Sequence, residues 1–178
     1  GAWQDSSLRV EGEDLKGSYK GIDFLSRLSD GEEIPIGRSA VIIGGGNTAM
    51  DCTRNLIRLG VKEVNLVYRR TRKEMPANPV EIEAAEAEGV KFQFLAAPVQ
   101  VFGDENGVTT HLEYLKMELG EPDASGRRRP VPIEGSESML ETDMVITAIG
   151  QSPDISFVES MQQLSELKTT RWNTFDVD

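Results

Sequence analysis

Apolar and polar residues follow a pattern in the first half of the chain that predicts strands and helices in turn. The apolar runs Ser39–Ile43 and Glu63–Tyr68 predict buried strands, and Asn47–Leu59 between them predicts a helix. A second helix is predicted over Pro79–Glu88, followed by a strand over Lys91–Leu95. This order of strand, helix, strand, helix and strand is typical of a parallel sheet covered by helices.

The pattern changes in the second half of the chain. Val99–Phe102 and Thr109–Glu118 are strand-like and are separated by a cluster of turn residues, and a short strand is predicted near Arg129–Ile133. These three segments are expected to form an antiparallel meander. The last predicted strand, Asp143–Ile149, is a continuous apolar run, which favours a buried central position in a sheet.

A glycine turn, Gly44-Gly45-Gly46, joins the first of these strands to its helix. Together with Ala49 it forms the Gly-x-Gly-x-x-Ala variant of the dinucleotide-binding fingerprint, in the strand-turn-helix context that the motif requires. Gly44 permits the tight turn, and Gly46 has no Cβ that would keep phosphates at a distance. Ala49 lets the helix pack close to the strand.

The start of the helix and the end of the last strand complete the expected site. Asn47 and Thr48 are placed at the N-cap and in the first helical turn, where unpaired N–H groups and the helix dipole favour a pyrophosphate. Ala148, Ile149 and Gly150 are expected at the carboxyl edge of the sheet, beside the cofactor. The predicted fold is therefore α/β, a Rossmann-like NAD(P)-binding domain in which a parallel sheet with helices carries a three-stranded antiparallel meander.

The residues after the second strand indicate which dinucleotide binds. An NAD site usually has a carboxylate there for the ribose hydroxyls, whereas this chain has Arg69, Arg70 and Arg72 before the first carboxylate, Glu74. Guanidinium groups stay charged and bind two phosphate oxygens at once, so they suit a 2′-phosphate. A solvated basic loop is the alternative, but in so acidic a chain the position favours NADP(H).

Charge and composition exclude several kinds of partner and cross-link. The 178 residues carry a formal net charge of −11, with 30 acidic against 19 basic residues, which argues against nucleic acid or an anionic membrane as the main partner. The single cysteine, Cys52, excludes a disulfide within the chain and fits a cytoplasmic protein. No apolar run is long enough to span a membrane. For Arg127-Arg128-Arg129 a solvated loop is favoured over a docking patch or a second anion site.

The sequence shows no catalytic constellation. It has no Ser/His/Asp set, no spacing of metal ligands and no Tyr-x-x-x-Lys pair, and the lone histidine, His111, has no second ligand or base near it in sequence. A domain that binds nicotinamide needs no acid–base group if hydride passes directly to a flavin held elsewhere. No catalytic and no metal-binding residue is therefore predicted.

Four segments in order resemble the NADPH-binding domain of the glutamate synthase small (beta) subunit family of FAD/NAD(P)-dependent oxidoreductases. They are Gly44–Asp51, Tyr68-Arg69-Arg70 followed by Met75-Pro76-Ala77, Glu88–Phe92, and Asp143 through Ala148-Ile149-Gly150 to Asp154. The resemblance implies a flavoprotein in which NADPH passes hydride to FAD and electrons leave through iron–sulfur clusters. It implies as partners the FAD domain of the same parent chain and a large glutamate synthase-type or other redox subunit.

The resemblance also implies a division of the chain. Residues 1–36 would lead in from a FAD domain, beginning with a strand end at Gly1-Ala2, residues 37–150 would be the NADP(H)-binding domain, and residues 151–178 would return toward the FAD domain. The chain lacks the FAD fingerprints and the cluster-ligand cysteines of the family. It is thus expected to bind nucleotide without turning over alone. An NADH-dependent relative and a non-catalytic interaction module with a degenerate nucleotide site are the alternatives.

Overall fold

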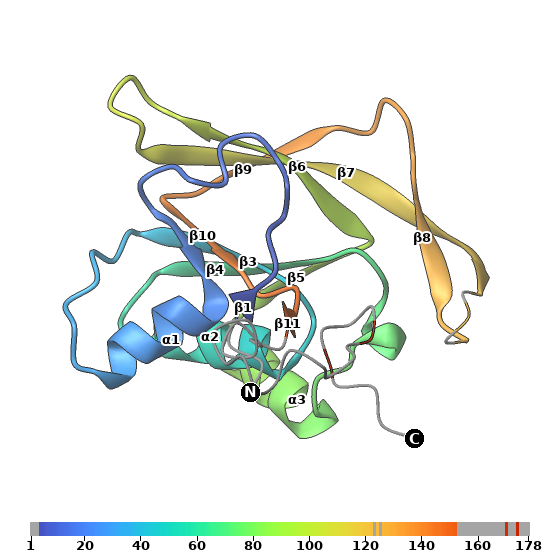
Figure 1. The fold of residues 1–178 in the computed structure, drawn as a ribbon, viewed down its shortest axis with the longest axis horizontal. Coiled ribbons are helices and arrows are strands. Elements are labelled where there is room, and N and C mark those ends of the chain that lie inside the picture. Colours follow the sequence, from blue (N-terminus) through green and yellow to red (C-terminus); the bar gives the residue numbers. More distant parts are fainter. Residues whose placement is uncertain (1–3, 123, 125, 153–169, 171–173, 175–178) are drawn as a thin grey trace, which may run out of the picture.

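The computed structural model describes residues 4–122, 124, 126–152, 170 and 174, and these form three layers (Figure 1). A parallel sheet lies in the middle. Helices α1 (Gly21–Ser29), α2 (Asn47–Arg58) and α3 (Pro79–Ala87) lie on one of its faces, and an antiparallel sheet lies across the other. The parallel sheet is thus covered on both sides, by helices on one and by strands on the other.

The parallel sheet has five strands in the order β2-β10-β3-β4-β5, all parallel. Their bounds are β2 Ser18–Lys20, β3 Ser39–Ile43, β4 Glu63–Tyr68, β5 Lys91–Phe94 and β10 Met144–Thr147. The central position predicted for the last apolar run is confirmed, since β10 pairs with β2 on one side and with β3 on the other. The carboxyl ends of β10, β3 and β4 therefore lie next to one another.

Alternate residues of these strands fill two separate cores. Ile42, Leu66 and Ile146 pack toward the helices, in a cluster with buried residues of α1, α2 and α3. Val41 and Val67 belong to a second cluster, shared with buried residues of the antiparallel sheet. Because successive side chains of a strand point to opposite faces, burial of both faces requires the unbroken apolar runs seen in the sequence.

The antiparallel sheet consists of β6 (Ala96–Gly103), β7 (Thr109–Pro122), β8 (Arg128–Pro132) and β9 (Ser138–Glu141). Its order is β6-β7-β8, as expected for the predicted meander, and β9 pairs with the first half of β7 as a fourth strand. That strand was not predicted. Its residues alternate only between half-buried and exposed positions, so its hydrophobic pattern is too weak to mark a strand.

The helix ends follow from local sequence. The Asn78 side chain accepts a hydrogen bond from the N–H of Val80, at 3.1 Å, and so caps α3. Gly60 and Gly89 follow the C-caps of α2 and α3 with φ of +93° and +97°. Only glycine adopts such angles easily, so these residues end the helices within one residue of the predicted positions.

The chain enters and leaves this unit through a two-stranded link. β1 (Gln4–Asp5) pairs antiparallel with β11 (Gln151–Ser152), and the Asp5 carboxylate accepts a hydrogen bond from the N–H of Ile22 at 3.1 Å. Asp5 thereby caps α1, whose own N-cap residue, Lys20, supplies no side-chain cap. Burial raises the pKa of Asp5 above its ordinary value.

The link bears on the predicted division of the chain. Both β2 and α1 come from the segment 1–36 predicted to lead in, yet they pack as an edge strand and a covering helix of the parallel sheet. The strand end predicted at Gly1-Ala2 lies outside the described residues. So does the return segment 151–178, apart from residues 151, 152, 170 and 174.

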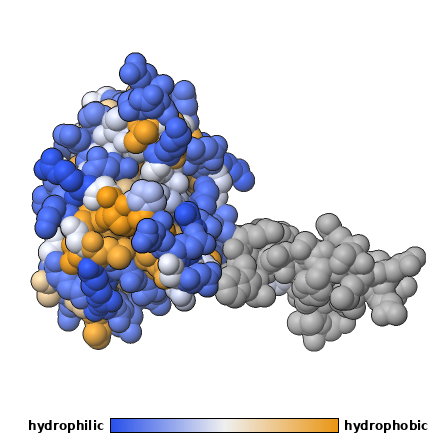
Figure 2. All heavy atoms as spheres, turned by 90° about the vertical axis from the view of Figure 1, so that its left-hand side faces the viewer, coloured by the Kyte–Doolittle hydropathy of each residue, from blue (hydrophilic) through white to orange (hydrophobic). Residues whose placement is uncertain are grey.

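The surface seen in Figure 2 is mostly hydrophilic, in keeping with the net charge of −11, and includes a central area of hydrophobic residues. Such a mixture is normal for a folded domain, because apolar atoms make up much of any protein surface. Within the part of the chain that the structure describes, no helix is long and apolar enough to cross a membrane.

Candidate nucleotide-binding site

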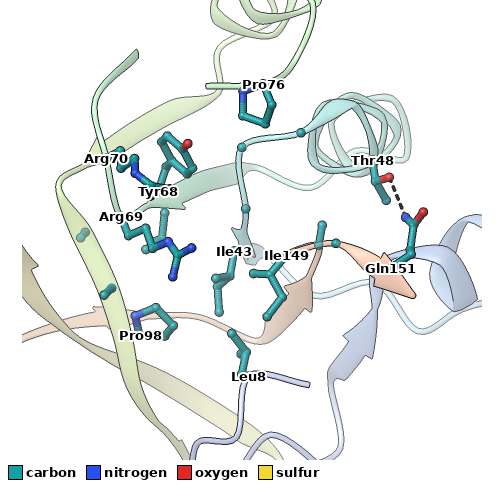
Figure 3. A pocket seen from close by; sticks show the side chains of 18 of the residues that line it. Leu8, Ile43, Thr48, Tyr68, Arg69, Arg70, Pro76, Pro98, Ile149 and Gln151 are labelled. Carbon is teal, nitrogen blue, oxygen red and sulfur yellow. Dashed lines mark hydrogen bonds between the residues drawn. The ribbon is translucent and has the colours of Figure 1, made fainter. Parts of the chain in front are cut away.

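A cavity of about 610 Å³ opens where β3, β4 and β10 end (Figure 3). This volume lies in the range of pockets that hold small molecules and cofactors. Most of the residues predicted for the site line it: Gly44, Gly45, Gly46, Thr48, Arg69, Arg70, Ala148, Ile149 and Gly150. Asn47 and Arg72 are not among its lining residues.

The three glycines of the turn have different surroundings. Gly44 has φ +147°, and a Cβ there would lie 2.2 Å from the carbonyl oxygen of Ala148. A Cβ on Gly45 would lie 2.6 Å from Cε2 of the Tyr68 ring. A Cβ on Gly46 would meet no atom within 4 Å. The first two glycines therefore allow the turn to pack, and the third leaves open the space predicted for a pyrophosphate.

Helix α2 starts one residue earlier than the placement of Asn47 at the N-cap assumes. The N-cap is Gly46, in extended conformation, so Asn47 is the first helical residue. Its side-chain oxygen accepts a hydrogen bond from the N–H of Asn78 at 2.9 Å and ties down the start of α3. Because Gly46 has no side chain to cap α2, the first N–H groups of the helix remain available to an anion.

The two arginines after β4 take different positions. Arg69 is exposed, and its guanidinium group points into the cavity (Figure 3). Arg70 is 5% exposed, and its Nε donates a hydrogen bond to the carbonyl oxygen of Arg128 at 2.8 Å. Arg70 thus joins the end of β4 to the antiparallel sheet, while the Arg69 guanidinium is directed into the cavity.

Arg72 and Glu74 belong to a short 3₁₀ turn, Arg72–Glu74, and neither residue lines the cavity. The Arg72 guanidinium pairs with the carboxylate of Glu86 on α3. The Glu74 carboxylate accepts a hydrogen bond from the N–H of Thr71 at 3.1 Å, and its bonds to Thr71 lower the pKa of Glu74. Glu74 thereby forms a capping box with Thr71 and is not presented to a ribose.

The end of β10 forms the opposite wall. The N–H of Ala148 donates to the carbonyl oxygen of Ile43 at 2.8 Å, which holds it beside the glycine turn. Gly150 has φ +121° and turns the chain into β11, where its carbonyl oxygen accepts a hydrogen bond from Ser6 at 3.0 Å. The Ile149 side chain lies between these points and extends into the cavity, where an apolar surface suits a ring (Figure 3).

Cys52 and His111 lie outside the cavity. Cys52 is fully buried under α1, and burial raises the pKa of its thiol. His111 lies half-buried in β7, within the antiparallel sheet. Among residues 4–122, 124, 126–152, 170 and 174, no group of three or more His, Cys, Asp or Glu is placed to hold a metal ion.

Comparison with known families identifies the family of the chain. The model of the pyridine nucleotide-disulphide oxidoreductase family matches residues 1–178. The chain belongs to the pyridine nucleotide-disulphide oxidoreductase family. Over 177 residues it is 49% identical to the NADPH-Fe(3+) oxidoreductase subunit beta of Geobacter sulfurreducens, covering 98% of this chain and 26% of that protein.

The resemblance drawn from the four segments is confirmed. The chain is 37% identical over 190 residues to the glutamate synthase [NADPH] small chain of Azospirillum brasilense, with 100% of this chain and 39% of that protein covered. It therefore spans between about a quarter and two-fifths of these two relatives. The fold is confirmed by the thioredoxin reductase of T. acidophilum, at TM-score 0.70 and 19% identity over 98% of this chain and 49% of that one.

In this member of the pyridine nucleotide-disulphide oxidoreductase family, sequence reasoning missed several residues of the cavity. Leu8 and Pro98 come from the segment before β2 and from β6, and no local motif marks them. Arg127, expected in a solvated loop, lines the cavity beside the end of β4, while the Arg128 guanidinium donates to the carbonyl oxygen of Gly120 at 3.0 Å. Gln151 also lines the cavity, and its place directly after Ala148-Ile149-Gly150 was a signal that could have found it.

Proposed function

We propose that this chain is the NADP(H)-binding domain of a flavoprotein oxidoreductase of the glutamate synthase small-subunit type. NADPH bound here would supply hydride to a flavin held by the FAD domain of the parent chain, with electrons leaving through iron–sulfur clusters. The described residues supply binding and orientation. The relatives named as subunits support a further redox subunit as partner. The single cysteine supports the cytoplasm as the compartment.

The observation that carries this proposal is the exposed guanidinium of Arg69, directed into a cavity whose floor is a glycine turn. With the pyrophosphate on Gly46 and the first turn of α2, a dinucleotide reaching toward the end of β4 would bring its adenosine ribose to Arg69. Glu74, the first carboxylate after β4, is held by Thr71 and does not repel a 2′-phosphate there. This arrangement favours NADP(H) over NAD(H).

The residues on the other side would position the nicotinamide half. Ile149 and Ile43 extend apolar surface into the cavity, and Leu8 approaches from the segment before β2 (Figure 3). Such a wall holds a nicotinamide ring by its face and keeps water from it, which leaves the other face for the flavin. Proton transfer from the protein is not needed in this scheme.

The test is a calorimetric titration of the chain with NADPH and NADH, repeated with Arg69→Ala. Loss of hydrogen bonds between a guanidinium and a phosphate is expected to weaken NADPH binding by about 10- to 100-fold, because such charged bonds contribute about 1.5–3 kcal/mol. NADH lacks the 2′-phosphate, so its affinity should change by less than about 3-fold. Arg58→Ala, which removes the same charge from an exposed site on α2, serves as the matched control and should leave both affinities as they are.

The alternatives give different results. Equal losses for both nucleotides in Arg69→Ala would overturn the 2′-phosphate assignment and support an NADH-dependent relative. Absence of binding at millimolar concentration of either nucleotide would support a non-catalytic interaction module. Flavin absorbance in the purified chain would contradict the assignment of FAD to another part of the parent protein.

A further inference from the structure

Gln151 makes a contact that joins the link strand β11 to the fingerprint helix. Its side-chain Nε2 donates a hydrogen bond to Oγ1 of Thr48 at 3.1 Å, and both residues line the cavity (Figure 3). Thr48 lies in the first turn of α2, beside the open space at Gly46. A residue outside the glycine motif therefore reaches the part of the site where a pyrophosphate would bind.

The chemistry of the two groups gives this contact a direction. The N–H of a carboxamide only donates, whereas a threonine hydroxyl both donates and accepts. While Thr48 Oγ1 accepts from Gln151, its own proton is left to donate to a neighbour, and a phosphate oxygen accepts such a proton strongly. Without Gln151, a hydroxyl at this position is free to bond to nearby backbone instead.

The backbone of Gln151 is itself held in place. β11 pairs with β1 through Asp5 and Gln151, and Asp5 is fixed in turn by its hydrogen bond from the N–H of Ile22. On the preceding residue, Gly150, the carbonyl oxygen accepts from Ser6 at 3.0 Å. These contacts fix the backbone that carries the carboxamide relative to α2. A group that orients another side chain must itself be held in this way.

We propose that Gln151 is a positioning residue for the diphosphate of the bound nucleotide. It holds the Thr48 hydroxyl as a hydrogen-bond donor toward the phosphates and does not contact the 2′-phosphate. The proposal rests on the proposed function, since it needs a dinucleotide in the cavity. It differs from the Arg69 assignment in that NADPH and NADH share the diphosphate, so both depend on Gln151 equally.

The test is a double-mutant cycle on the full chain, titrated with NADPH and NADH. Gln151→Ala is expected to weaken both nucleotides by the same factor, about 3- to 10-fold, as for one lost neutral hydrogen bond. Thr48→Val removes the bond to phosphate and should weaken both by about 10-fold or more. The double variant should bind as Thr48→Val does, because Gln151 acts only through the hydroxyl.

Two further variants separate orientation from packing. Gln151→Glu keeps the shape of the side chain but removes its N–H donor, so its affinity should fall at least as far as that of Gln151→Ala. Thr48→Ser keeps the hydroxyl and should retain affinity together with the sensitivity to Gln151→Ala. Thr110→Val, which removes a hydroxyl hydrogen-bonded to Phe102 outside the cavity, is the matched control for loss of a threonine hydroxyl and should leave both affinities unchanged.

Multiplied losses in the double variant, or full affinity in Gln151→Glu, would overturn the role of Gln151. So would a loss confined to NADPH. If the unmodified chain binds neither nucleotide, the proposed function itself fails and this role fails with it. A chain that binds NADPH normally while Gln151→Ala has no effect refutes the positioning role alone.

Discussion

Gly45→Ala is expected to destabilise the fold through a side-chain contact, without involvement of the cofactor. The added Cβ would lie 2.6 Å from Cε2 and 2.7 Å from Cδ2 of Tyr68. Carbon atoms pack at about 3.5 Å or more, so the ring must move by about 1 Å. Tyr68 is 7% exposed, and its hydroxyl donates to the carbonyl oxygen of Glu74 at 2.8 Å. The movement would stretch or break this hydrogen bond.

The expected size of the effect follows from these contacts. Overpacking a buried site costs about 1–3 kcal/mol, and loss of one hydrogen bond adds about 1 kcal/mol. Alanine restricts the unfolded chain more than glycine does, which offsets about 0.4–1 kcal/mol because Gly45 has no positive φ. The free energy of unfolding should therefore fall by about 1–3 kcal/mol, and the Tm by about 3–9 °C for a chain of this length.

Thermal unfolding followed by circular dichroism measures this change. In a Tyr68→Leu background the ring is absent, so the same Gly45→Ala substitution should cost less than about 0.5 kcal/mol. Gly46→Ala is the neighbouring control: it should change stability by no more than about 1 kcal/mol, while nucleotide affinity falls because the methyl group enters the phosphate space. An unchanged Tm for Gly45→Ala, or an equal loss with and without the Tyr68 ring, would refute the reasoning.

Two further predictions concern charged side chains. Arg72→Ala should weaken NADPH binding less than Arg69→Ala does, because the Arg72 guanidinium is paired with Glu86 away from the cavity; an equal or larger loss by titration would place the 2′-phosphate beside Arg72. Asp5→Ala should lower the free energy of unfolding by about 0.5–2 kcal/mol through loss of the α1 cap, whereas Asp5→Asn keeps an acceptor and should be as stable as the unmodified chain at pH 7. The raised pKa of Asp5 means that its proton binds the folded state more tightly than the unfolded state. The free energy of unfolding should therefore rise as pH falls through the folded pKa of Asp5. Melting curves of Asp5→Asn recorded over the same pH range should lack this rise.

Much of the parallel sheet could be predicted because its signals are local. The strands Ser39–Ile43 and Glu63–Tyr68 are apolar on both faces, and the structure gives them the predicted bounds. The cap of α2 was predicted one residue too late, because Asn47 is a better capping residue than glycine by propensity. Gly45, the residue before the cap, packs against Tyr68. This is a tertiary contact, so no local rule predicts it.

The parts of the site that sequence reasoning missed come from distant segments. Gln151 bonds to Thr48 across most of the chain, and Arg127 reaches the cavity only because β8 pairs with the far end of β7. The motif Tyr68-Arg69-Arg70 pointed to both arginines equally, although one of them is buried. Whether a guanidinium faces solvent or a carbonyl depends on the layer above it, and that layer is set by long-range pairing.

The difference in burial between the adjacent residues Arg69 and Arg70 has a consequence for how such a domain can evolve. Arg70 is buried and bonded to the carbonyl oxygen of Arg128, so replacing it disturbs the joint between two sheets. Arg69 is exposed and contributes to the cavity alone. Under the proposed function, substitutions at position 69 would change cofactor preference with little loss of stability. In this proposal, cofactor specificity depends on a residue that contributes little to the stability of the fold.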